Sequence, residues 1–82
     1  MKERDYIIRL FDIYGKLFTD KQVTYFKEYY FEDLSLSEIA EKYGVSKSII
    51  SRTINNVESK LKEYESILEV LKLKEKLDKL EK

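Results

Sequence analysis

Residues 34–61 read LSLSEIAEKYGVSKSIISRTINNVESKL, which is the most specific structural pattern in the chain. Two helices that cross at a steep angle over a short turn need particular residue types at fixed positions. Ala40 is small where the helices come close, Gly44 supplies the positive φ of the turn, and Ser46 can cap the second helix. The stretch therefore predicts a helix-turn-helix unit of the nucleic-acid-binding type over about residues 35–61.

Capping and apolar residues predict the helices around this unit. Thr19 with Gln22, and Ser35 with Glu38, have the spacing of capping boxes, which start helices. Gly15 is expected to weaken or end the first helix. Apolar residues spaced by three and four positions form the inward sets Tyr6, Ile7, Leu10, Phe11, Tyr14 and Leu17, then Val23, Phe26 and Tyr30, then Ile39, Ala40 and Tyr43.

The helix after the turn continues as a heptad stripe toward the C-terminus. The members of the stripe are Ile50, Ile54, Val57, Leu61, Tyr64, Leu68 and Leu71. The apolar pattern then restarts on a shifted face with Leu73, Leu77 and Leu80. Either one long helix contains a stutter, or a break near Ser66 separates a further helix. We favour the break, with a C-terminal helix over about residues 62–82.

The composition excludes several classes of protein. The chain has 82 residues, with no Cys, no His, no Pro and two Gly. It lacks the ligands of a zinc site and has no Gly-rich phosphate loop, so we expect no metal, no cofactor and no enzymatic activity. The scarcity of helix breakers predicts an all-α fold of four or five helices in a single domain, residues 1–82.

The same sequence argues against insertion into a membrane. No apolar run approaches the roughly 18 residues that a spanning helix needs. The N-terminus, MKERDYIIRL, is charged too early to be a secretory signal. We therefore expect a cytoplasmic protein.

Charge is unevenly distributed along a chain that is neutral overall. Residues 1–43 hold seven basic and nine acidic side chains, a net charge of −2, and residues 63–82 hold five and six, a net charge of −1. Residues 44–62 hold four basic side chains and one acidic, a net charge of +3. The positive charge thus falls on the second helix of the helix-turn-helix, where nucleic acid would bind.

The outward positions of that helix are polar, and none is acidic. They are Lys47, Ser48, Ser51, Arg52, Asn55, Asn56 and Ser59. Arg can bond bidentately to guanine and Asn to adenine, while Ser and Lys can contact phosphates. The first six of these positions, Lys47 to Asn56, are the predicted nucleic-acid-binding residues. The alternatives are an ordinary soluble surface or a protein-interaction module.

Residues 10–66 resemble the YlxM family of small bacterial proteins. The most specific matches are DxYxxLxTxKQ at Asp12–Gln22, YYxEDLSLSEIAE at Tyr29–Glu41 and GVS at Gly44–Ser46. The resemblance implies a fold like region 4 of sigma factors, and often a homodimer. Family members are usually encoded beside the signal recognition particle GTPase, which implies a role in, or regulation of, that protein-targeting pathway.

The chain departs from the family in the second helix of the helix-turn-helix. Family members typically read close to SRQAVYDNIKRT, whereas this chain has Lys47 after the cap and Asn55-Asn56 in place of a basic pair. Fewer cations release fewer counterions, so the non-specific affinity for DNA or RNA is expected to be weak.

Two further features leave alternatives open. The aromatic residues Tyr25, Phe26, Tyr29, Tyr30 and Phe31 can form core, a protein interface, or a stack for single-stranded RNA bases. The C-terminal leucines can fold back on the first helix or pair with a second copy, and we favour a homodimer. A protein-interaction adaptor of the targeting GTPase, or a partner of RNA polymerase, are the alternatives to a nucleic-acid-binding regulator.

Overall fold

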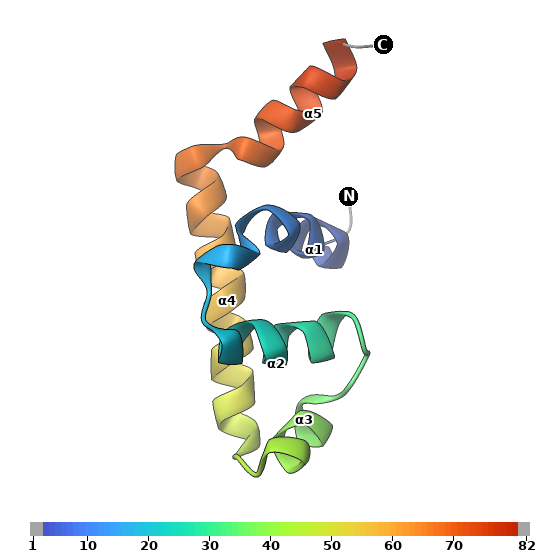
Figure 1. Ribbon diagram of the computed structural model, residues 1–82, viewed down its shortest axis with the longest axis vertical. Helices are drawn as coiled ribbons and strands as arrows, with labels where there is room; N and C mark the ends of the chain where they lie inside the picture. The colour runs from blue at the N-terminus through green and yellow to red at the C-terminus, as the bar shows by residue number, and fades with distance from the viewer. Residues whose placement is uncertain (1–2, 81–82) are drawn as a thin grey trace.

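A computed structural model describes residues 3–80 as five α-helices and one short 3-10 helix, with no strand in that range (Figure 1). The elements are α1 (Glu3–Tyr14), η1 (Gly15–Leu17), α2 (Asp20–Tyr30), α3 (Leu36–Tyr43), α4 (Lys47–Leu68) and α5 (Val70–Leu80). The predicted all-α fold is confirmed. Within residues 3–80, no helix contains an apolar stretch of the length that spanning a bilayer requires.

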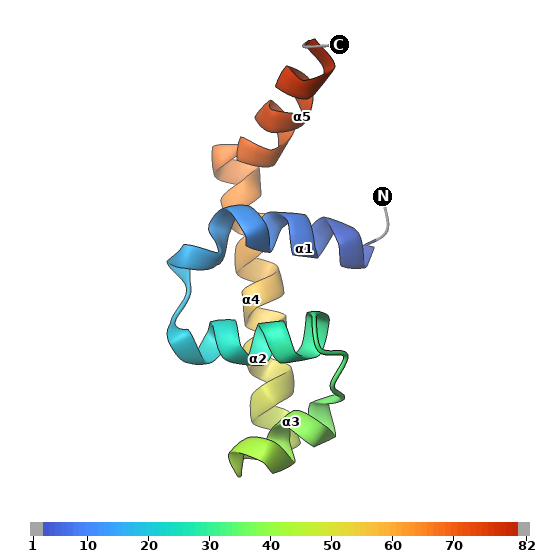
Figure 2. The same ribbon diagram turned by 45° about the vertical axis from the view of Figure 1, so that its right-hand side comes forward.

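The long helix α4 is the rod on which the other helices pack. Helices α1 and α2 lie across it one beyond the other, α3 lies at its N-terminal end, and α5 leads away from its C-terminal end (Figures 1 and 2). The molecule is accordingly elongated, with extents of 48 × 22 × 18 Å. The amphipathic stripe of α4 faces the three preceding helices, so one continuous core runs along it.

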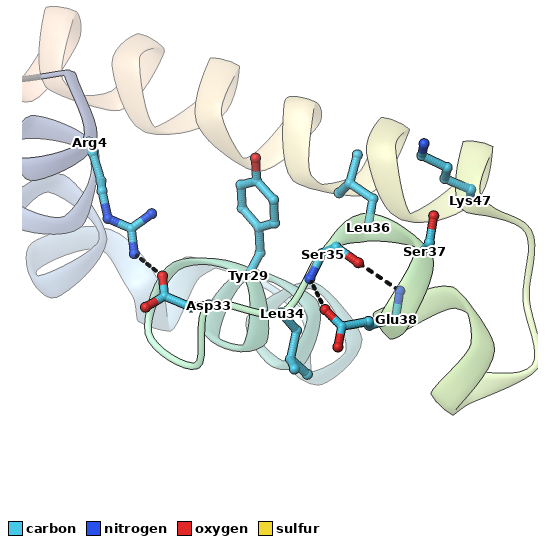
Figure 3. A pocket seen from close by; sticks show the side chains of 9 residues that line it. All are labelled: Arg4, Tyr29, Asp33, Leu34, Ser35, Leu36, Ser37, Glu38 and Lys47. Atoms are coloured by element: carbon cyan, nitrogen blue, oxygen red, sulfur yellow. Dashed lines mark hydrogen bonds and ion pairs between the residues drawn. The ribbon is translucent and has the colours of Figure 1, made fainter.

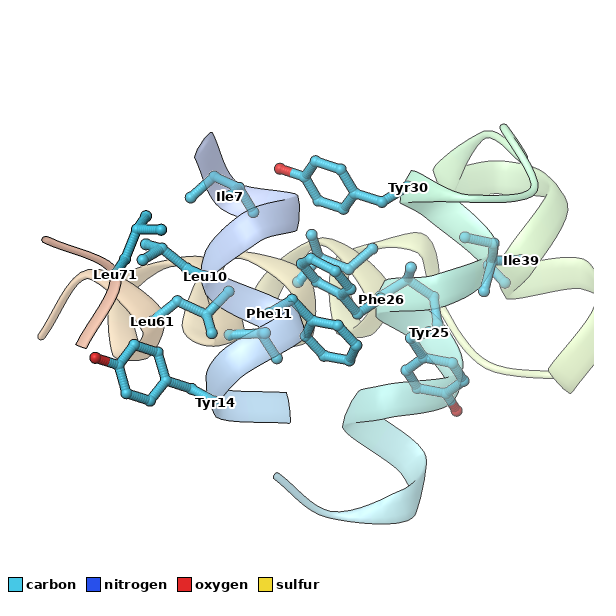
Figure 4. Packing of buried hydrophobic residues seen from close by; sticks show 14 residues of the cluster. Ile7, Leu10, Phe11, Tyr14, Tyr25, Phe26, Tyr30, Ile39, Leu61 and Leu71 are labelled. Atoms are coloured by element: carbon cyan, nitrogen blue, oxygen red, sulfur yellow. The ribbon is translucent and has the colours of Figure 1, made fainter. Parts of the chain in front are cut away.

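The core is built from the residues that the helical spacing selects (Figure 4). Its buried members are Ile7, Leu10, Phe11, Tyr14, Tyr25, Phe26, Tyr30, Ile39, Ala40, Ile50, Ile54, Val57, Leu61 and Leu71. The rings of Phe11 and Phe26 stack with centroids 4.1 Å apart and join α1 to α2. The predicted apolar faces of the helices are confirmed at most positions.

Three predicted core residues are instead exposed. Leu17 is 57% exposed because α1 ends at Tyr14 and the helical spacing no longer applies in η1. Tyr43 is 38% exposed, since its ring packs on Tyr25 from outside and its hydroxyl donates a hydrogen bond to a carboxylate of α2. Leu68 is 55% exposed because the chain turns directly after it.

The turn between α4 and α5 lies at Glu69, beyond the expected break near Ser66. Glu69 adopts the left-handed conformation, with φ 50° and ψ 33°. Helix α5 begins at Val70 rather than at about residue 62, and the buried Leu71 packs it against α1. Of the C-terminal leucines, Leu71 thus packs back on the first helix, whereas Leu73 and Leu77 are exposed. The side chain of Leu80 and residues 81–82 lie outside the described part of the chain.

The start of α5 is held by a carboxylate of α4. One oxygen of Glu65 accepts hydrogen bonds from the Tyr14 hydroxyl, at 2.8 Å, and from the backbone N–H of Leu71, at 3.1 Å. The other oxygen accepts from the N–H of Lys72, also at 3.1 Å. The first N–H groups of a helix have no partners within it, so Glu65 supplies the cap that the new helix needs.

Candidate nucleic-acid interface

The turn of the helix-turn-helix depends on the backbone of Gly44. Its φ of 66° and ψ of 35° are left-handed, which side-chain-bearing residues adopt at a cost. In this conformation the N–H of Val45 reaches the carbonyl of Ala40 at 3.0 Å, and the N–H of Gly44 reaches that of Glu41 at 3.4 Å. The last carbonyls of α3 are thereby satisfied. The positive φ predicted for Gly44 is confirmed.

Side-chain caps start both helices of the unit. The Ser35 hydroxyl accepts from the N–H of Glu38 at 3.1 Å, and the Glu38 carboxylate accepts from the N–H of Ser35 at 2.9 Å. The Ser46 hydroxyl accepts from the N–H of Ile49 at 3.2 Å and starts α4. The capping box at Ser35–Glu38 and the cap at Ser46 are confirmed, as is the earlier capping box at Thr19–Gln22.

Buried isoleucine and valine fix the rotation of α4 about its axis. Ile50, Ile54 and Val57 are all between 0% and 3% exposed. Ile39 and Ala40 of α3 belong to the same core cluster. A helix anchored on one face along this length leaves its opposite face in solvent, and that face carries the predicted binding residues.

All six predicted binding residues lie together on that outer face. They are Lys47, Ser48, Ser51, Arg52, Asn55 and Asn56, which we call the recognition surface. They line one shallow open depression, and only Ser51 among them is half-buried. Leu36, at the start of α3, lines the same depression and was missed, because it comes from another element.

Two cations of the recognition surface are not engaged in ion pairs within residues 3–80. Lys60 and Lys62, which also belong to the net positive segment, pair with Glu63 at 3.5 Å and with Glu3 at 2.6 Å. Lys47 and Arg52 have no such partner in the described structure and are exposed. The charge available to a ligand on this face is therefore +2, less than the +3 counted along the sequence.

The acidic residue of the same segment is engaged elsewhere. Glu58 is half-buried and accepts a hydrogen bond from the hydroxyl of Tyr30. Burial, and then this bond to a carboxylate, raise the pKa of Tyr30, so the hydroxyl remains a donor at neutral pH. Glu58 is not among the residues that line the recognition surface.

A second pocket adjoins the recognition surface at Lys47 (Figure 3). It is lined by the start of α3, including Ser37 and Glu38, and by Arg4 of α1. Arg4 donates to the backbone carbonyl of Tyr30, and its guanidinium lies 3.0 Å from the carboxylate of Asp33. Sequence reasoning missed Arg4, because no local pattern indicates a contact with residues so far along the chain.

Comparison with known proteins agrees with this helix-turn-helix geometry. The family UPF0122, described as "Putative helix-turn-helix protein, YlxM / p13 like", matches residues 1–82. The chain belongs to the UPF0122 family. The resemblance predicted from the motifs at Asp12–Gln22 and Tyr29–Glu41 is confirmed.

Relatives in the UPF0122 family come from several bacteria. The chain is 53% identical to the UPF0122 protein of Ureaplasma urealyticum serovar 10 over 66 residues, covering 80% of this chain and 67% of that one. It is 47% identical over 62 residues to the UPF0122 proteins of Shouchella clausii and Bacillus thuringiensis, covering 76% of this chain. The match spans 57% and 56% of those two proteins, little more than half of their length.

Proposed function

We propose that this UPF0122 protein is a non-enzymatic, cytoplasmic regulatory protein that binds nucleic acid, duplex DNA before RNA, through the recognition surface. The proposal rests on one observation. Six polar or cationic side chains, none of them acidic, lie together on the outer face of the second helix of a helix-turn-helix, five of them exposed and Ser51 half-buried. A groove of DNA accepts a helix with such a face.

Each residue type on the recognition surface suits a particular contact. Arg52 can bond to guanine or to a phosphate, and Asn55 and Asn56 have the donor and acceptor pair that reads adenine. Lys47 follows the Ser46 cap, where the first N–H groups and the dipole of α4 also favour a phosphate. Ser48 can add a hydrogen bond to the backbone of the nucleic acid.

The small charge of the surface sets the expected strength of binding. Each phosphate that a cation neutralises contributes a slope of about −0.9 to the dependence of log affinity on log salt. Lys47 and Arg52 together predict a slope near −2, so non-specific binding will be weak and visible mainly at low salt. Specific binding would depend more on the Asn and Ser contacts.

The proposal is tested by fluorescence anisotropy with labelled duplex DNA and with signal recognition particle RNA at low and moderate salt. The double variant Lys47→Ala/Arg52→Ala should bind at least about tenfold more weakly at low salt. The control Lys21→Ala/Lys79→Ala removes the same charge from exposed positions of α2 and α5 and should bind like the parent. No binding by the parent, or equal losses in the two double variants, would eliminate the proposal.

We also propose that the protein acts as a homodimer joined through α5. Leu73 and Leu77 are 56% and 49% exposed, on the side of α5 opposite the buried Leu71. A two-fold dimer would present two recognition surfaces to two half-sites.

A second candidate is an adaptor of the signal recognition particle GTPase, with the helix-turn-helix as a scaffold. The family resemblance suggests that pathway, and the exposed aromatic Phe31 supports a protein contact. A pull-down with the purified GTPase, alone and with its RNA, tests it. Retention that Lys47→Ala/Arg52→Ala leaves unchanged supports the adaptor, and failure to retain the GTPase in both conditions contradicts it.

A further inference from the structure

An apolar groove lies between α1 and α2 and shares no residue with the recognition surface. Its volume is about 610 Å³. The groove is lined by Phe11, Gly15, Val23 and Phe31, which are apolar, and by Asp12, Lys16 and Lys27, which are charged. A ligand could therefore occupy it while nucleic acid is bound to α4.

The half-exposed ring of Phe31 packs on two rings of the core. Phe31 is 49% exposed, although the ring meets Phe26 edge-on and Phe11 at a tilt, each with centroids 6.4 Å apart. The backbone N–H of Phe31 donates a hydrogen bond to the carbonyl of Lys27 at 2.8 Å, and this bond closes the C-terminal end of α2. A large apolar side chain that already packs on the core beside a groove has less freedom to lose when a partner binds.

Gly15 keeps the same groove open at the end of α1. A Cβ at this position would lie 3.3 Å from the Phe11 ring, closer than most such contacts. The ring therefore lies directly against the backbone of Gly15, at a point where a larger residue would press on it. Phe11 and Gly15 together thereby form an apolar wall of the groove.

The charges around the groove favour an acidic ligand. Lys16 and Lys27 are exposed, and neither has an ion-pair partner among the described residues. Asp12 is the one acid that lines the groove, which leaves a net charge of +1. An apolar group with flanking carboxylates would match both the wall and the two lysines.

We propose that this groove binds an acidic amphipathic segment of another protein, with an apolar side chain against Phe11, Val23 and Phe31 and carboxylates near Lys16 and Lys27. Nucleic acid fits less well, because the groove offers its phosphates only two cations, and the rest of its lining is largely apolar. The α5 helix of a second copy also fits poorly, because Lys72, Lys74 and Lys76 surround its exposed leucines and would meet the groove's own lysines.

The test uses a fluorescein-labelled helical peptide of about three turns, with Leu on one face and Glu on the other. The full chain should bind it saturably. Phe31→Ala and Lys16→Glu/Lys27→Glu should each weaken binding at least about tenfold. Lys21→Glu changes an exposed lysine of α2 outside the groove and should stay within about twofold of the parent.

Further controls distinguish binding in the groove from simple charge attraction and from RNA binding. A peptide with Ala in place of Leu should lose most of the affinity, since it lacks the apolar anchor. Absence of saturable binding, equal effects of Lys21→Glu and Lys16→Glu/Lys27→Glu, or displacement of the peptide by oligouridylate would each overturn the proposal. Binding of DNA should be unchanged in Phe31→Ala, so this test and that of the recognition surface fail independently.

Discussion

Gly44 shows how one backbone conformation supports the helix-turn-helix. No atom lies within 4 Å of a Cβ built there, so space does not restrict the position and only its φ of 66° does. Gly44→Ala should therefore lower the free energy of unfolding by about 1 kcal/mol, measured by urea denaturation. Gly44→Asn should lose less, because Asn tolerates this conformation better. Equal stability of Gly44→Ala and the parent would contradict the account.

Glu28 is a buried carboxylate that joins α2 to α3. The Lys42 ammonium lies 2.6 Å from it and donates a hydrogen bond, as does the Tyr43 hydroxyl. These two bonds lower the pKa of Glu28 from its ordinary value of 4.5, although burial acts in the opposite direction. Since the folded-state pKa is the lower one, the stabilisation is complete above pH 4.5 and is lost as the pH falls through the folded-state value.

The substitution Glu28→Gln tests that linkage. At pH 7 the variant should be less stable by about 1 kcal/mol, a modest loss because Lys42 is largely solvent-exposed. The difference should shrink as the pH is lowered below 4.5 and through the folded-state pKa of Glu28, because the parent's carboxyl then becomes protonated. Urea denaturation over a series of pH values measures it. A difference between parent and variant that is independent of pH would refute the interpretation.

For individual residues, the sequence predicts those contacts that join positions close together along the chain. The caps at Thr19, Ser35 and Ser46 bond to residues three positions away, so their spacing alone reveals them. The exposed position of Tyr43 was not predicted, because it depends on Glu28, 15 residues earlier and on another helix. Helical periodicity contains no information about such a partner.

Among the elements, α5 packs mainly on α1, and Glu65 provides its cap. Glu65→Ala would leave the Tyr14 hydroxyl and the N–H groups of Leu71 and Lys72 without this acceptor. Amide hydrogen exchange at the start of α5 should become about tenfold faster, with little change in α2 and α3. Glu63→Ala is the matched control, since Glu63 makes only an exposed pair with Lys60. Equal exchange in the two variants would contradict this role.

The position of the α4–α5 turn was predictable only approximately. The shift of the leucine pattern indicates a change of direction after Tyr64, which is the reason for expecting a break near Ser66. The turn lies at Glu69 because Glu65 can then reach the N–H groups of α5 while Tyr14 donates to the same carboxylate. The contact with Tyr14 crosses 51 residues and has no signature in the sequence.

The exposed leucines of α5 give a prediction for the whole molecule. If α5 forms the proposed dimer, sedimentation equilibrium should give twice the chain mass for the parent, and Leu73→Glu/Leu77→Glu should give a monomer. Both side chains are already exposed, so the substitution should leave the fold of one chain intact. Leu17→Glu alters an equally exposed leucine elsewhere and should remain dimeric. A monomeric parent, or a dimeric double variant, would disprove the pairing.

The arrangement of surfaces in the whole molecule was only partly predictable. The six residues of the recognition surface could be selected from one helix, because the buried positions of α4 determine which side chains face outward. Arg4 and Leu36, and the groove between α1 and α2, arise where separate elements meet. Their positions follow from tertiary packing, which no single helical pattern describes.

The most direct test of the proposed nucleic-acid interface maps binding onto the residues by NMR. Duplex DNA is titrated into the ¹⁵N-labelled full chain at low salt, and amide chemical shifts are followed. The account predicts shifts concentrated between Lys47 and Asn56, which disappear as salt is raised and in Lys47→Ala/Arg52→Ala. Shifts centred on α5 or on the Phe31 groove, or none at any DNA concentration reached, would contradict it.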